Sequence, residues 1–144
     1  MHERYSEGET NTIAQKLLAL VTPYDDRATV VGLSGDLGAG KTTLTKAIGK
    51  TVGVEETIQS PTFVIGKFYD TNDDRFKKMV HIDAYRIESE NELTPLGWDN
   101  ILQSPQTLII IEWPERIKAS LPADTHLFTI NHDNQHRIII HEKN

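Results

Sequence analysis

The sequence contains no cysteine, so disulfide bonds, thiolate metal sites and cysteine nucleophiles are all excluded. It also lacks an apolar run long enough to cross a bilayer, and its first residues lack the basic-then-apolar pattern of a signal peptide. Positive charge is scarce, because the chain has 15 Lys and Arg residues but 21 Asp and Glu residues, which gives a net charge of −6. This balance argues against a broad non-specific grip on nucleic acid, although a local basic patch is compatible with it. We therefore expect one domain spanning residues 1–144, located in the cytoplasm and without a membrane segment.

The most informative feature present is a glycine-rich loop at residues 35–42, which reads G-D-L-G-A-G-K-T and matches the pattern G-x-x-x-x-G-K-T. A β-prone run at 29–33 precedes this loop and a helical pattern follows it, as a P-loop requires. The glycines permit a tight turn that aims consecutive backbone N–H groups at a phosphate, at the positive end of the helix dipole. Lys41 adds a charge near the β- and γ-phosphates of ATP, and the Thr42 hydroxyl can bind Mg²⁺. The predicted nucleotide-binding residues here are Gly35, Asp36, Leu37, Gly38, Ala39, Gly40, Lys41, Thr42 and Thr43.

The rest of the chain alternates helical and strand-like segments and has no internal repeat. Residues 6–9 fit a capping box, and the amphipathic helix after them stops before Pro23. The continuous apolar run at 108–111 is typical of a strand covered on both faces. Further strands are expected at 63–69, 78–85, 127–130 and 137–141, and a helical stretch at 88–102 is interrupted by Pro95 and Gly97. We predict an α/β fold, a three-layer P-loop NTPase sandwich whose central, mostly parallel sheet carries an added antiparallel hairpin.

Hydrolysis of a nucleotide needs an acidic group near the metal besides the P-loop. Two candidate catalytic carboxylates follow β-runs, since Glu112 ends the apolar run at 108–111 and Asp83 ends the segment V-H-I-D. The pattern does not say which of them contacts Mg²⁺ and which orients the attacking water. Thr62 is a third candidate, because nucleotide switches place a γ-phosphate sensor at this point of the chain. His81 alternates with Asp83 on one strand face and could hydrogen-bond near the site.

Four motifs, in this order and spacing, closely resemble the TsaE family, formerly called YjeE. They are the loop at 35–43, Ser-Pro-Thr-Phe at 60–63, His-Ile-Asp-Ala-Tyr-Arg at 81–86 and Glu-Trp-Pro-Glu at 112–115. The resemblance covers nearly the whole chain, from Glu9 and Thr10 to the final strands, and the segment after Ile130 is its least diagnostic part. Together the four motifs are far more specific than the P-loop alone.

The resemblance implies a small bacterial ATPase that is needed to form threonylcarbamoyladenosine on tRNA, at the adenosine beside the anticodon. Members of the family associate with the threonylcarbamoyl transferase (TsaD) and its partner (TsaB), and their ATP hydrolysis resets that complex between turnovers. Contact with tRNA would be only indirect. These roles agree with the acidic net charge of the chain.

The resemblance also implies roles for individual residues. The loop amides and the loop lysine would hold the phosphates, and Thr10 would lie near the nucleotide. Thr42 and Glu112 would hold Mg²⁺. Asp83 and Thr62 would help to position or activate water.

The motifs contain no obvious arginine finger, since Arg86 is the only arginine within them. We therefore expect slow hydrolysis by the isolated protein and faster turnover once a partner orders the site. Two other classes stay open. A small-molecule kinase shares the P-loop, but the sequence has no arginine-rich lid segment. A non-catalytic switch of the GTPase type is disfavoured because the guanine-reading pattern Asn-Lys-x-Asp is missing.

Overall fold

The apolar run at 108–111 lies at the centre of the fold. It belongs to β5 (Thr107–Glu112), in which every residue is buried, as expected for a strand covered on both faces. In the computed structural model, which describes residues 1–59 and 64–143, β5 pairs in parallel with β2 (Thr29–Ser34) and with β4 (Lys78–Asp83). β6 (His126–Asp133) pairs in parallel with the other edge of β2. Four neighbouring strands thus form the predicted parallel centre.

Antiparallel strands extend this centre on both sides. β3 (Gly66–Asp70) pairs with β4 and forms the predicted hairpin. β7 (His136–Lys143) pairs with β6, and β1 (His2–Tyr5) then pairs with β7. The seven-stranded sheet has the order β1-β7-β6-β2-β5-β4-β3, so it is a mixed sheet whose parallel centre confirms the predicted α/β fold.

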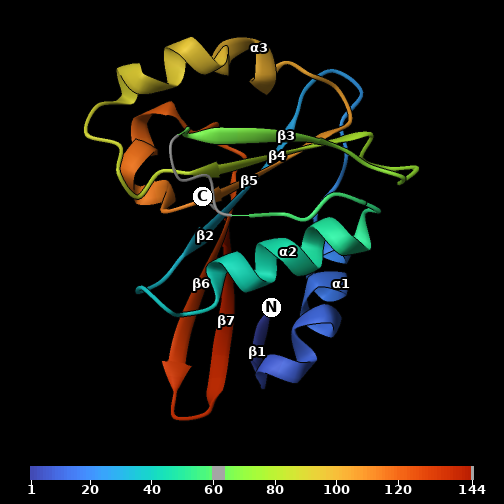
Figure 1. Cartoon of the computed structure of the whole chain (residues 1–144), viewed down its shortest axis with the longest axis vertical. Coiled ribbons are helices and arrows are strands. Elements are labelled where there is room, and N and C mark those ends of the chain that lie inside the picture. Colours follow the sequence, from blue (N-terminus) through green and yellow to red (C-terminus); the bar gives the residue numbers. More distant parts are fainter. Residues whose placement is uncertain (60–63, 144) are drawn as a thin grey trace.

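Helices cover both faces of the sheet. Figure 1 shows α1 (Thr10–Leu20) and α2 (Lys41–Thr51) together on one face, whereas α3 (Trp98–Leu102) lies on the other. The remaining helical segments are the 3-10 helices η1 (Glu7–Glu9), η2 (Glu90–Leu96) and η3 (Pro114–Ser120). In the described part of the chain, none of the helices combines the length and the apolar character that a membrane span requires.

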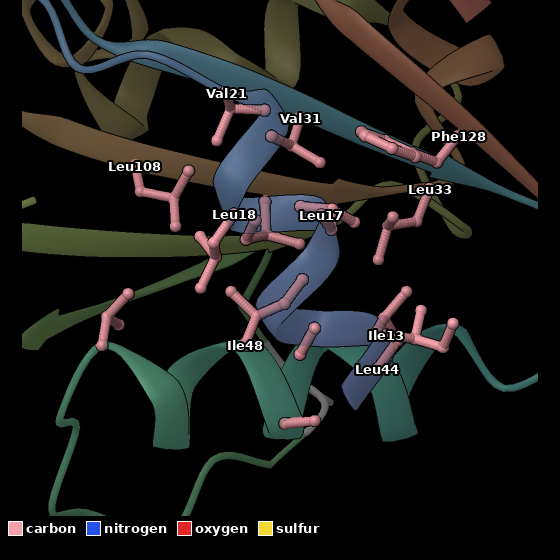
Figure 2. Close-up of a cluster of buried hydrophobic side chains, with 14 of the residues drawn as sticks. Ile13, Leu17, Leu18, Val21, Val31, Leu33, Leu44, Ile48, Leu108 and Phe128 are labelled. Atoms are coloured by element: carbon pink, nitrogen blue, oxygen red, sulfur yellow. The ribbon is translucent and has the colours of Figure 1, made fainter. Parts of the chain in front are cut away.

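The larger core lies between the sheet and the pair α1 and α2. Apolar residues recur along α1 at the spacing of one helix face, so this face is buried against α2 and the sheet. Burial of each such side chain contributes about 1.5–3 kcal/mol, which fixes α2 and the loop before it on the sheet. The labelled side chains of Figure 2 are Ile13, Leu17, Leu18, Val21, Val31, Leu33, Leu44, Ile48, Leu108 and Phe128.

Several element boundaries differ from those predicted. β4 ends at Asp83 rather than at residue 85, because the backbone N–H of Tyr85 bonds to the Asp83 carboxylate and the chain turns. β3 begins at Gly66, later than the predicted start at 63, a residue outside the described part. β1 and η3 were not predicted. The capping box at 6–9 is confirmed, since the Ser6 backbone N–H donates to Glu9 Oε1 at 3.0 Å.

Candidate functional site

The glycine-rich loop connects the end of β2 to the start of α2. Its backbone uses conformations that favour glycine, with φ values of 79° at Gly38 and 104° at Gly40. A Cβ on Gly35 would collide with the carbonyl oxygen of Ile130 in β6, so the loop lies directly against the sheet. Gly40 is the N-cap of α2, which begins at Lys41 and has 11 residues. This is the strand–turn–helix geometry that a phosphate-binding loop needs.

Lys41 is held inside the loop and is buried, with 5% of its surface exposed. Its ammonium donates hydrogen bonds to the carbonyl oxygens of Gly35 and Asp36, the second at 2.8 Å. It also lies 4.2 Å from the centre of the Trp113 ring. Burial lowers the pKa of the Lys41 side chain, and nearby carboxylates, Glu112 first among them, raise it in part. The result is a desolvated cation beside a helix N-terminus, which an anionic ligand would stabilise.

A chain of hydrogen bonds joins the loop to two strands of the sheet. Oγ1 of Thr42 donates to Oε1 of Glu112 at 2.7 Å, and Nε2 of His81 lies 2.6 Å from Oε2 of the same carboxylate. The side chains of His81 and Glu112 are 0% and 3% exposed. The parallel register of β4 and β5 sets Asp83 directly opposite Glu112. These groups therefore gather at the carboxyl ends of the strands, where ligands of open α/β sheets bind.

Two aromatic side chains border the same region. Trp113 follows β5 in a left-handed conformation (φ 62°, ψ 51°), and its backbone N–H donates to the Leu33 carbonyl oxygen at 3.2 Å. This turn carries the Trp113 ring beside Tyr85, with 5.0 Å between the ring centroids. Because the ammonium of Lys41 lies over the Trp113 ring, the aromatic pair forms one wall of the site.

The loop, the strand ends and this wall enclose a pocket of about 270 Å³. Most of the predicted site residues line it, and three residues outside the predicted set join them. The lining residues are Leu37, Gly38, Gly40, Lys41, Thr42, Thr43, Asp83, Tyr85, Glu112, Trp113 and Arg137.

Among the predicted residues that the structure describes, Thr10, Gly35, Asp36 and Ala39 do not belong to this lining. Ala39 is buried in the core beneath the loop. Thr10 lines a neighbouring pocket of about 410 Å³, which shares Thr43 with the first pocket, so the two cavities adjoin. The Thr10 hydroxyl donates to the Glu7 carbonyl oxygen at 2.6 Å. Thr62 lies outside the described residues.

Two residues of the β6–β7 hairpin reach the loop, although neither belongs to a sequence motif. Cζ and Nε of Arg137 lie 2.9 Å from the point that a Cβ on Gly40 would occupy. Nη1 of Arg137 is buried and has no hydrogen-bond partner within residues 1–59 and 64–143. His132, the cross-strand neighbour of Arg137, donates from Nε2 to the Gly38 carbonyl oxygen. From the sequence alone, Arg137 could be recognised only as a basic residue on an expected strand.

Comparison with known proteins places this geometry in context. The family described as "Threonylcarbamoyl adenosine biosynthesis protein TsaE" matches residues 5–139. Proteins named "tRNA threonylcarbamoyladenosine biosynthesis protein TsaE" are similar in sequence. The one from Bacillus subtilis is 39% identical over 116 residues, which cover 81% of this chain and 67% of the relative. The one from Rickettsia typhi is 40% identical over 119 residues, covering 82% of this chain and 76% of the relative.

Another relative of the same name and one solved structure complete the comparison. The protein from Streptomyces coelicolor is 42% identical over 87 residues, so the match covers 60% of this chain and 57% of the relative. The crystal structure of Bacillus subtilis YdiB superposes with a TM-score of 0.73 at 27% identity, covering 100% of this chain and 86% of that one.

Proposed function

Because this chain belongs to the TsaE family, we propose that it serves threonylcarbamoyladenosine formation on tRNA as a cytoplasmic, Mg²⁺-dependent ATPase. The observation that carries the ATPase proposal is the pocket in which Lys41 meets the carboxylates of Asp83 and Glu112. A loop with a buried cation binds phosphates, and carboxylates beside it hold a metal ion and water. Positioning and charge neutralisation of this kind are what phosphoryl transfer to water requires.

The cations of the pocket are assigned to the phosphates of ATP. Lys41 is paired with two carbonyl oxygens of its own loop, and a phosphate would give its charge a stronger partner. Arg137 lies against the loop at Gly40, and its buried Nη1 lacks a partner in the described chain. A phosphate oxygen would satisfy this N–H group. We therefore assign Arg137 to the nucleotide, on the side of the loop that faces the β6–β7 hairpin.

The oxygen atoms at the other side of the pocket fit a magnesium ion. Oγ1 of Thr42 and Oε1 of Glu112 are hard donors 2.7 Å apart, and Asp83 ends the neighbouring strand. Among the described residues, no group of three or more His, Cys, Asp or Glu could hold a metal ion. The pair of carboxylates suits Mg²⁺, which proteins usually bind through one or two carboxylates together with water and substrate phosphates. When bound, the ion would neutralise charge on the β- and γ-phosphate oxygens.

The two carboxylates are assigned different tasks. Both oxygens of Glu112 already have partners, Thr42 and His81, so Glu112 is fixed in place as expected of a metal-binding group. Asp83 is only partly buried and lines the pocket, where it can orient the attacking water. We keep Thr62 as the proposed γ-phosphate sensor.

The proposed partners are the threonylcarbamoyl transferase (TsaD) and its partner (TsaB), with tRNA contacted only indirectly. ATP hydrolysis should be measured with purified protein and Mg²⁺, alone and with both partners, and with Lys41→Ala as the control. We expect slow turnover alone, stimulation by the partners, and loss of most nucleotide affinity in Lys41→Ala. Equal rates with and without the partners would refute the stimulation. Wild-type turnover in Lys41→Ala would refute the assignment of the pocket.

The same preparation distinguishes an ATPase from the other two P-loop classes. Competition between ATP and GTP for binding should favour ATP, whereas a strong preference for GTP would indicate a nucleotide switch. Transfer of the γ-phosphate to an added nucleoside or small alcohol, instead of to water, would indicate a kinase.

A further inference from the structure

The side chain of His81 is fully buried and engages one oxygen of Glu112. Its Nε2 lies 2.6 Å from Oε2, while Oε1 of the same carboxylate accepts the Thr42 hydroxyl at 2.7 Å. Each carboxylate oxygen therefore has a different partner, one from β4 and one from α2. An ionised carboxylate has no proton to give, so Nε2–H of His81 is the donor in this contact.

The position of His81 is otherwise suited to an apolar residue. Its cross-strand neighbour Ile110 and its same-face neighbour Met79 both belong to the core beneath α1 and α2. Nδ1 of His81 is buried and has no hydrogen-bond partner within residues 1–59 and 64–143. Since a buried polar atom without a partner is unfavourable, the stability of the fold does not account for a histidine here. The contact with Glu112 does.

We propose that His81 is a positioning residue that makes the metal site selective for Mg²⁺ over Ca²⁺. By hydrogen-bonding to Oε2, it leaves Oε1, which accepts the Thr42 hydroxyl, as the Glu112 oxygen that is available to the proposed metal ion. Ca²⁺ takes six to eight oxygens and readily uses both oxygens of a carboxylate, whereas Mg²⁺ needs an octahedral set with few protein ligands. A carboxylate held with one oxygen capped therefore favours the smaller ion. This inference rests on the proposed function, because it assumes a metal–nucleotide site at Thr42 and Glu112.

The test compares His81→Leu, which removes the donor, with His81→Gln, whose side-chain amide can reach Oε2 in place of Nε2. Binding of a fluorescent ATP analogue is measured while Mg²⁺ or Ca²⁺ is titrated into the protein. The half-saturating concentrations of the two ions give a ratio, which is compared between the wild type and the variants. In His81→Leu we expect the ratio to shift toward Ca²⁺ by about tenfold, within the range known for residues that support metal ligands. His81→Gln should keep the wild-type ratio. Should His81→Leu fail to fold, His81→Asn replaces it, because its shorter amide does not reach Oε2.

Binding of the analogue in EDTA separates this inference from the function on which it rests. Wild-type protein should bind the analogue without metal, and the variants should do so equally well. Absence of binding in the wild type both with metal and in EDTA would overturn the proposed function and the inference together. Intact metal-free binding with an unchanged ratio in His81→Leu would overturn the inference alone. An equal shift in His81→Gln and His81→Leu would do the same, because a disturbance of the core would then explain both.

Discussion

At the scale of single residues, the site contains polar groups whose burial is unfavourable. Four buried side-chain atoms in the described chain lack a hydrogen-bond partner, and two of them, His81 Nδ1 and Arg137 Nη1, belong to the site or its support. Lys41 is a third unfavourable group, because burial lowers its pKa and so disfavours its charged form. Such groups persist where function needs them, since a bound anion would supply a partner for the side chains of Lys41 and Arg137.

Tyr5 is a useful contrast, because its buried hydroxyl also lacks a described partner but lies in the core cluster outside the pocket lining. Tyr5→Phe should leave the free energy of unfolding unchanged or raise it by up to about 1 kcal/mol, since it removes an unsatisfied polar group. Tyr5→Ala, the control, should lower it by about 3–5 kcal/mol through the cavity it creates. Urea unfolding measures both. A clear loss of stability in Tyr5→Phe would mean that the hydroxyl is satisfied after all.

The lowered pKa of Lys41 predicts how nucleotide affinity depends on pH. Burial lowers this pKa in the free protein, whereas a bound phosphate raises it by favouring the ammonium. Lys41 therefore contributes its full share to nucleotide affinity at pH values below its pKa in the free protein. Above that pH, nucleotide affinity falls by up to about tenfold per pH unit until the pH passes the pKa of Lys41 in the nucleotide complex. Nucleotide titrations between about pH 7 and pH 10 would show this decline.

Lys41→Arg is the matched control for this dependence, because a guanidinium stays charged throughout that range. Its affinity should be weaker at pH 7 but nearly constant as the pH rises. A wild-type affinity that is equally constant would contradict the lowering of the Lys41 pKa in the free protein.

At the scale of helices and strands, glycines lie at several positions where helices begin or end. Gly53 follows α2 and Gly97 separates η2 from α3, both with φ of 79°. A Cβ on Gly53 would lie 2.8 Å from Cβ of Asn72 and 3.0 Å from its backbone nitrogen, whereas one on Gly97 would meet nothing within 4 Å. The two positions therefore share backbone strain but differ in steric clash.

This difference predicts unequal effects of the same substitution. Gly97→Ala should lower the free energy of unfolding by about 1 kcal/mol, the usual cost of a left-handed alanine. Gly53→Ala should lower it by about 2–3 kcal/mol, because backbone atoms at Asn72 cannot move aside as a side chain can. Gly8→Ala, at a glycine with open space and no positive φ, is the control and should be close to neutral. Equal decreases in the free energy of unfolding for Gly53→Ala and Gly97→Ala would show that backbone strain alone, and not the steric clash, destabilises both variants.

Elements with strong local signals were predictable, and those formed by tertiary pairing were not. The apolar run of β5 and the turn before α2 were predicted correctly, because a strand buried on both faces demands apolar residues and a left-handed turn demands glycine. β1 was missed because its sequence, H-E-R-Y, is short and polar and becomes a strand only by pairing with β7. Arg137 was missed for the same reason, since only the fold brings the β6–β7 hairpin to the loop.

At the scale of the whole molecule, the site depends on strands that are distant in sequence. β2 carries the loop, β5 and β4 carry the two carboxylates on one side of it, and β6 with β7 supports the loop on the other side. Core clusters on both faces of the sheet hold these strands in place. Residues of one pocket thus come from much of the sheet, so a ligand in that pocket stabilises all of these elements at once.

This arrangement predicts that the chain unfolds in a single cooperative transition and that nucleotide shifts the whole transition. A non-hydrolysable ATP analogue with Mg²⁺ at about 100 times its Kd should add about 2.7 kcal/mol, which raises the Tm of a chain of this size by about 8 °C. Calorimetry would measure the shift, and circular dichroism and tryptophan fluorescence should report the same midpoint. Lys41→Ala should unfold as cooperatively as the wild type but without the shift. Two separate transitions, or a shift confined to one probe, would contradict the single-domain prediction, because the loop and the β6–β7 hairpin would then unfold independently.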